Sequence, residues 1–184
     1  MRELRNPDQT HIPAFDDPDA FIHLKETAMK VTLQQLPATR VAYLRYIGAY
    51  GPGIGVFWRE TAAPWMLEHQ LFNRVRYGIG HDDPDLTPAD KCRYDACVEV
   101  PEDFKASAPA VVTTLPGGLY AVAHYRGLGP AIADAWIELC RDWLPKSGLQ
   151  FDPRPAFERY PADAFYDVKT GELECEICIP VKKL

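Results

Sequence analysis

The sequence predicts an α+β fold in which two tandem strand–helix–strand–strand units form one largely antiparallel sheet with two helices packed on it. Three observations predict it: residues 41–71 match residues 117–149, each copy contains an amphipathic helix, and each is followed by strand-like segments that also match. A self-match of this length indicates a structural repeat. One unit alone cannot bury its apolar face, so we expect the two units side by side with a central ligand groove between them.

The match between the copies is carried mainly by glycine, proline and aromatic residues. The first copy has Gly51, Pro52, Trp58, Glu60 and Trp65 where the second has Gly129, Pro130, Trp136, Glu138 and Trp143. The final strands match as well, since Val98 and Pro101 correspond to Ile177 and Pro180. We therefore divide the chain into a polar tail or linker at residues 1–29 and one domain at 30–184, with halves at about 30–105 and 106–184.

The first unit begins with strand-like residues 30–48, in which Pro37 predicts either two strands or one bulged strand. Gly51-Pro52 begins the first helix, whose apolar residues recur at helical spacing on one face. Pro64 lies within this helix and is expected to kink or shorten it. Two more strands complete the unit, at residues 73–80 and 92–100.

The second unit repeats this order. Strand-like residues 108–127 turn at Pro116-Gly117-Gly118, and the second helix runs from Gly129 until Pro145. A short FERY segment at 157–160 precedes the last strand. In that strand, alternation places Leu173, Cys175, Ile177 and Ile179 on one face and Glu172, Glu174, Glu176 and Cys178 on the other.

Composition limits the partners. The net charge is −6 and no basic run exists beyond the terminal Lys182-Lys183, so we expect no direct binding to nucleic acid. No apolar run is long enough to cross a bilayer, and the N-terminus lacks the apolar core of a signal peptide. We expect a cytoplasmic protein, a monomer or weak dimer, with no membrane partner.

Neither a metal nor a cofactor is indicated. The five cysteines are an odd, scattered set, and Cys175 and Cys178 would point to opposite faces of one strand. Reduced thiols are the simplest interpretation. The glycine-rich starts of the two helices lack the lysine of a phosphate-binding loop. We therefore expect no cofactor and no metal.

The duplicated pattern resembles the GyrI-like (SbmC) family, which includes the effector-binding domains of AraC-type regulators. The segments that carry the resemblance are LTPADKCRYDACVEV, GGLYAVAHYRGLGPAIADAW, DWLPKSG, PAFERY and ECEICIPV. Their order and spacing span roughly residues 30–184. The resemblance implies an SHS2-like repeat fold. A DNA-binding domain would need about 100 further residues, so we expect the stand-alone form of the family.

The resemblance also implies the site residues. It places Glu158 and Glu176 in a pocket that meets cationic aromatic ligands, although a glutamate on a terminal strand is otherwise most often a solvated surface residue. It names Trp136 as a ligand contact, whereas the aromatic stripe containing Trp65 and Trp143 is more typical of core. The aromatic walls are completed by Tyr94, Tyr120 and Tyr160, with Tyr125 as either wall or core.

Two functions follow from the resemblance. The first is a small-molecule-binding protein with an acidic, aromatic-lined groove for lipophilic or cationic aromatic compounds, acting in drug or toxin sensing, sequestration or modulation of DNA gyrase, which is then a partner. The second is a hydrolase that opens the cyclopropane ring of genotoxic compounds. In that case a groove glutamate, Glu158 or Glu176, is the general base and Tyr125 assists. Both use the same residues, so the sequence leaves both open.

Overall fold

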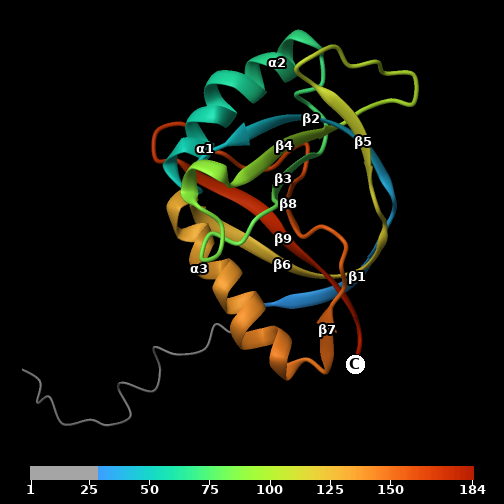
Figure 1. Ribbon diagram of the computed structural model, residues 1–184, viewed down its shortest axis with the longest axis vertical. Coiled ribbons are helices and arrows are strands. Elements are labelled where there is room, and N and C mark those ends of the chain that lie inside the picture. The colour runs from blue at the N-terminus through green and yellow to red at the C-terminus, as the bar shows by residue number, and fades with distance from the viewer. Residues whose placement is uncertain (1–28) are drawn as a thin grey trace, which may run out of the picture.

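The computed structural model describes residues 29–184, and the proposed tail falls almost wholly outside them. One sheet contains most of the described strands, in the order β1-β6-β9-β8-β3-β4-β2-β5, with β7 paired to β9 (Figure 1). Every pairing between named strands is antiparallel, and two helices accompany the sheet. The predicted α+β fold class is therefore confirmed. The strands are β1 (Val31–Leu36), β2 (Thr39–Ile47), β3 (Arg76–Gly80), β4 (Arg93–Glu99), β5 (Val111–Leu115), β6 (Gly118–Leu128), β7 (Leu149–Phe151), β8 (Phe157–Tyr160) and β9 (Glu172–Lys183).

Each half forms a strand–helix–strand–strand unit. In the first half β4 pairs with both β2 and β3, and in the second half β9 pairs with both β6 and β8. The halves meet where β3 pairs with β8, with Tyr77 opposite Arg159. A half-turn about this pair superposes β3 on β8 and maps each neighbouring residue pair onto the one on the other side. A pseudo-twofold axis that relates the two halves therefore passes through the pair.

Two short connections make the sheet curl. β1 continues into β2 through Pro37 and Ala38, and β5 continues into β6 through Pro116 and Gly117. β1 and β5 are the two ends of the strand order. β1 pairs with β6 of the second half but is joined by two residues to β2, and β5 pairs with β2 of the first half but is joined by two residues to β6. Proline cannot donate a ladder hydrogen bond, so both ribbons bend at these positions. The sheet consequently encloses a concave inner face (Figure 1).

Both helices lie on the outer face of the curled sheet (Figure 1). The first comprises α1 (Pro52–Phe57), a π-helical segment (Trp58–Ala62) and α2 (Ala63–Glu68). Pro64 does not shorten this helix. It falls in the first turn of α2, directly after the π-helical segment, where its missing N–H is tolerated. The second helix contains α3 (Ile132–Ile137) and its own π-helical segment (Glu138–Trp143).

Three apolar clusters form the core. One packs the first helix on β2 and β4 around Met66, and a second packs the other helix on β6 and β9 around Leu139. The third lies on the concave inner face around Tyr77, Tyr120 and Phe157 and includes no helical residue. Both faces of the sheet are therefore apolar. Successive side chains along one strand pack alternately against a helix on the outer face and into the core of the concave inner face. None of the described helices is long and apolar enough to span a bilayer.

Candidate functional site

Glu158 is the centre of a polar and aromatic cluster on the helix-bearing face, close to the pseudo-twofold axis. Its Oε2 accepts hydrogen bonds from the hydroxyls of Tyr160 at 2.8 Å and Tyr94 at 3.3 Å. Its Oε1 accepts one from the indole Nε1 of Trp136 at 3.1 Å. Strands β8 and β4 and helix α3 thus bring three aromatic donors to one carboxylate.

Trp58 extends this cluster from the first helix. Its Nε1 donates to the hydroxyl of Tyr94 at 2.9 Å, and its ring lies 5.9 Å from the ring of Tyr160. Trp58 and Trp136 occupy matched positions of the two copies, so each helix contributes its equivalent tryptophan to the cluster. Glu158, Tyr160 and both tryptophans are half-buried.

A glycine opposite Glu158 leaves space for the cluster. Gly78 on β3 pairs with Glu158 across the junction of the halves. A Cβ atom at Gly78 would lie 2.0 Å from the hydroxyl oxygen of Tyr94 and 2.7 Å from Oε2 of Glu158. Any side chain here would displace the groups that hold the carboxylate.

The electrostatics of Glu158 are those of a carboxylate without a counter-ion. Among the described residues, no lysine, arginine or histidine forms an ion pair with it. Burial raises the pKa of Glu158, and the three hydrogen bonds from Trp136, Tyr160 and Tyr94 oppose that rise without cancelling it. Burial and the nearby carboxylate also hold the pKa values of Tyr94 and Tyr160 well above the ordinary tyrosine value, so both hydroxyls remain donors.

The structure brings four of the residues expected at the site into direct contact. They are Glu158, Trp136, Tyr94 and Tyr160. Tyr125 is on the same face, but its hydroxyl donates to the carbonyl of Leu128 at 2.7 Å rather than to Glu158.

Glu176 and Tyr120 are not part of this cluster. Ile177 and Ile179 pack under the second helix, so Glu176 points to the concave face, where it pairs with Arg159. Tyr120 is buried in the core of that face and donates to the carbonyls of Pro116 and Pro155. The two expected glutamates therefore lie on opposite faces of the sheet.

Two members of the cluster, Trp58 and Gly78, were not predicted. The repeat itself contains the signal for Trp58, because Trp58 matches Trp136, but only Trp136 was expected to contact a ligand. Nothing in the local sequence marks Gly78, whose role depends on pairing between strands far apart in the chain. Within residues 29–184, no three His, Cys, Asp or Glu side chains gather as metal ligands would.

Comparison with known proteins identifies the family. The model of the GyrI-like small molecule binding domain matches residues 29–182. The "SPbeta prophage-derived putative transcriptional regulator YosT" of Bacillus subtilis is 34% identical over 84% of this chain and 100% of its own length. A DNA gyrase inhibitor of Edwardsiella piscicida is 31% identical over 84% of this chain and 99% of its own length.

Solved structures share the fold. The EcmrR C-terminal domain superposes with a TM-score of 0.66 at 14% identity, covering 85% of this chain and 99% of that domain. SAV2435 bound to tetraphenylphosphonium superposes with a TM-score of 0.56 at 21% identity, covering 84% of this chain and 94% of that one. With the repeat, the curled sheet and the sequence match in agreement, this chain belongs to the GyrI-like family of small-molecule-binding domains.

Proposed function

We propose that this protein binds lipophilic aromatic cations, with Glu158 as the counter-ion. One observation carries the proposal: a carboxylate desolvated among aromatic side chains accepts three hydrogen bonds from Trp136, Tyr94 and Tyr160, and no cation among the described residues pairs with it. The tetraphenylphosphonium bound to SAV2435, a protein of the same fold, is a ligand of this class.

The energetics favour a cationic ligand. An ionised carboxylate removed from water without a charged partner is costly, and neutral donors compensate only part of that cost. A bound cation supplies the missing charge. The rings of Trp58, Trp136 and Tyr160 offer faces that attract cations, each contact contributing about 0.5–2 kcal/mol. A delocalised cation suits this cluster best, because Glu158 already has its hydrogen-bond donors.

Sensing or sequestration of such compounds, or modulation of DNA gyrase, is the cellular role that we propose. Relatives named as a transcriptional regulator and as a gyrase inhibitor support these roles. Each of these roles implies a cytoplasmic protein. In sensing and sequestration, ligand binding at Glu158 is the molecular event, so the binding test comes first.

The test is equilibrium binding of tetraphenylphosphonium, compared with the neutral triphenylphosphine oxide. We expect the cation to bind more tightly than the neutral compound, and Glu158→Gln to weaken cation binding by about tenfold or more while affecting the neutral compound little. Glu176→Gln is the matched control, since it removes the same charge from the opposite face, and it should leave cation binding unchanged. An equal loss of cation affinity in both variants would contradict the assignment of Glu158 as the counter-ion.

A second candidate function uses the same carboxylate. The raised pKa of Glu158 and the adjacent Tyr160 hydroxyl are also the features of a general base with a hydrogen-bonding partner, which suits hydrolytic opening of a cyclopropane ring. Incubation with a cyclopropane-bearing alkylator, followed by mass spectrometry, distinguishes the functions. A water-added product that Glu158→Gln abolishes would establish the hydrolase, and unchanged substrate would leave binding as the function.

A further inference from the structure

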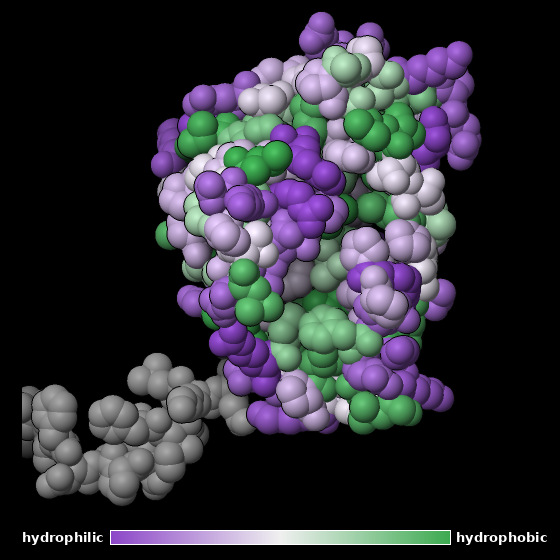
Figure 2. Space-filling view, viewed as in Figure 1, coloured by the Kyte–Doolittle hydropathy of each residue, from purple (hydrophilic) through white to green (hydrophobic). Residues whose placement is uncertain are grey.

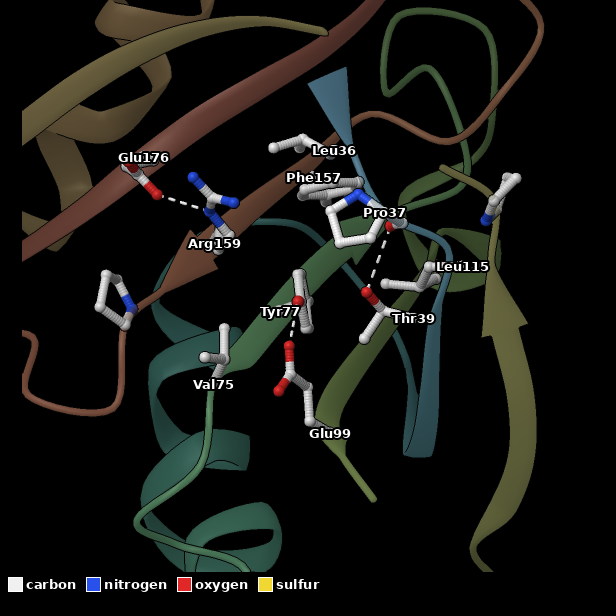
Figure 3. A pocket seen from close by; sticks show the side chains of 12 residues that line it. Leu36, Pro37, Thr39, Val75, Tyr77, Glu99, Leu115, Phe157, Arg159 and Glu176 are labelled. Carbon is white, nitrogen blue, oxygen red and sulfur yellow. Dashed lines mark hydrogen bonds and ion pairs between the residues drawn. The ribbon is translucent and has the colours of Figure 1, made fainter. Parts of the chain in front are cut away.

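The concave inner face of the sheet contains a cavity of about 330 Å³ (Figure 3). This volume lies within the range of small-molecule pockets. The surface is hollowed near the centre of the view in Figure 2, where apolar residues lie deep among hydrophilic ones. The cavity is lined by Leu36, Pro37, Thr39, Val75, Tyr77, Glu99, Leu115, Pro116, Phe157, Arg159, Pro161 and Glu176.

The sheet separates this cavity from the Glu158 cluster. Along β8, Phe157 and Arg159 line the cavity, while Glu158 and Tyr160 belong to the cluster on the helix-bearing face. Along β3, Tyr77 lines the cavity, while Gly78 faces the cluster. A ligand in the cavity therefore contacts none of the groups that hold Glu158.

An aromatic and aliphatic wall forms the apolar part of the cavity. Tyr77 and Phe157 pack edge to face with ring centroids 5.3 Å apart, and Tyr120 supports Phe157 from behind at 5.1 Å. Leu36 and Leu115 lie beside these rings (Figure 3). This packing fixes the wall and leaves a surface that suits a compact apolar group.

The charges in the cavity do not cancel. The guanidinium of Arg159 is held by Glu176, with its Nε 2.5 Å from Oε2, so these two charges neutralise each other. Glu99 accepts a hydrogen bond from the Tyr77 hydroxyl at 2.7 Å and forms no ion pair within the described part of the chain. Burial and Glu99 together raise the pKa of Tyr77, which keeps that hydroxyl a donor. One net negative charge, on Glu99, remains.

We propose that this cavity is a second binding site, for compact lipophilic amines. The ammonium group donates to Glu99, and the apolar body lies against Tyr77 and Phe157. An N–H cation suits this site because Glu99 has a single hydrogen-bond donor, in contrast to Glu158, which has three. The site is independent of the proposed function, because its residues and its face of the sheet differ.

Methyl NMR with phenethylamine tests the proposal. The protein carries Glu158→Gln to remove the cation partner on the other face, and its leucine and valine methyl groups are labelled. We expect phenethylamine to shift the methyl signals of Leu36, Leu115 and Val75, and 2-phenylethanol, the uncharged analogue, to bind about tenfold more weakly. Shifts confined to residues near Trp58 and Trp136 would overturn the proposal.

Two further variants keep the test decisive. Glu99→Gln can still accept the Tyr77 hydrogen bond but lacks the charge, so phenethylamine should bind about tenfold more weakly while 2-phenylethanol is unaffected. Val75→Phe places a larger side chain at a partly exposed wall position and should exclude both compounds. Unchanged phenethylamine affinity in either folded variant would overturn the proposal, and native methyl dispersion establishes that each is folded.

Discussion

Arg76 and Glu158 occupy equivalent positions in the two halves but carry opposite charges. Arg76 on β3 pairs with Val98, Glu158 on β8 pairs with Ile177, and Val98 and Ile177 are matched residues of the repeat. The same symmetry makes Gly78 the equivalent of Tyr160, since the pairs Arg76–Tyr160 and Gly78–Glu158 exchange about the axis.

The difference shows how a duplicated fold builds one asymmetric site. The second half supplies the acid and the large aromatic residue, and the first half supplies the glycine that leaves room for both. Arg76 does not neutralise Glu158. Its guanidinium lies over the ring of Phe72, its buried Nε has no hydrogen-bond partner within the described residues, and burial lowers its pKa. The symmetric scaffold therefore places two opposite charges near its axis that form no ion pair with each other.

Of the changes considered, adding a side chain at Gly78 should destabilise the protein most, because this glycine leaves the room that the asymmetric cluster needs. We expect Gly78→Val to lower the free energy of unfolding by about 3 kcal/mol, because its side chain overlaps Tyr94 and Glu158. Urea unfolding measures this. Gly55→Ala is the control, since a Cβ there meets nothing within 4 Å and the change should stay within about 1 kcal/mol. Equal midpoints for the two variants would contradict the packing at Gly78.

The two matched tryptophans should differ in their effects. Trp136→Phe removes a donor from the charged oxygen of Glu158 and should lower the free energy of unfolding near neutral pH by about 2 kcal/mol. Trp58→Phe removes only a donor to the Tyr94 hydroxyl and should cost about half as much. Urea unfolding of both variants at one pH makes the comparison, and a larger loss for Trp58→Phe would contradict it.

Removing the charge at Glu158 should stabilise the ligand-free protein. The folded state raises the pKa of this acid, so its contribution to stability is present below the unfolded pKa and is lost as pH rises through the folded pKa. Glu158→Gln removes that penalty, and the tyrosine hydroxyls can rotate to accept from its amide. The variant should therefore melt higher than the native protein near neutral pH, with the difference vanishing in acid. A lower melting temperature near neutral pH would contradict the desolvated carboxylate.

Removing the charge at Arg76 should have the smallest effect. Arg76→Met keeps the contact with Phe72 and eliminates the unpartnered Nε, so we expect the free energy of unfolding to rise by less than about 1 kcal/mol. Arg154→Met is the contrasting variant, because that guanidinium binds Asp152 and the carbonyls of Gly117 and Leu119 and should cost about 3 kcal/mol. If chemical denaturation showed that both variants lose a similar free energy of unfolding, the Arg76 guanidinium would have hydrogen-bond partners comparable with those of Arg154, and the prediction would be wrong.

The repeat in the sequence was sufficient to predict the fold. Matched glycines, prolines and tryptophans marked the units, and alternation along the last strand correctly separated Glu176 from Ile177. What alternation leaves open is which face of each strand meets the helices, because the curl of the sheet decides this. The two glutamates were therefore expected at one site although β8 and β9 present them to opposite faces. Gly78 and the inner cavity also depend on this curl, so no local pattern indicates them.

The most direct test of the central claim is the pKa of the Glu158 side chain, measured by carbon NMR of its labelled carboxyl group with and without tetraphenylphosphonium. We predict a pKa above the ordinary glutamate value in the free protein and a lower one in the complex, because a bound cation favours the ionised form. An ordinary pKa in the free protein, or one that the cation leaves unchanged, would contradict the assignment of Glu158 as an unpaired counter-ion.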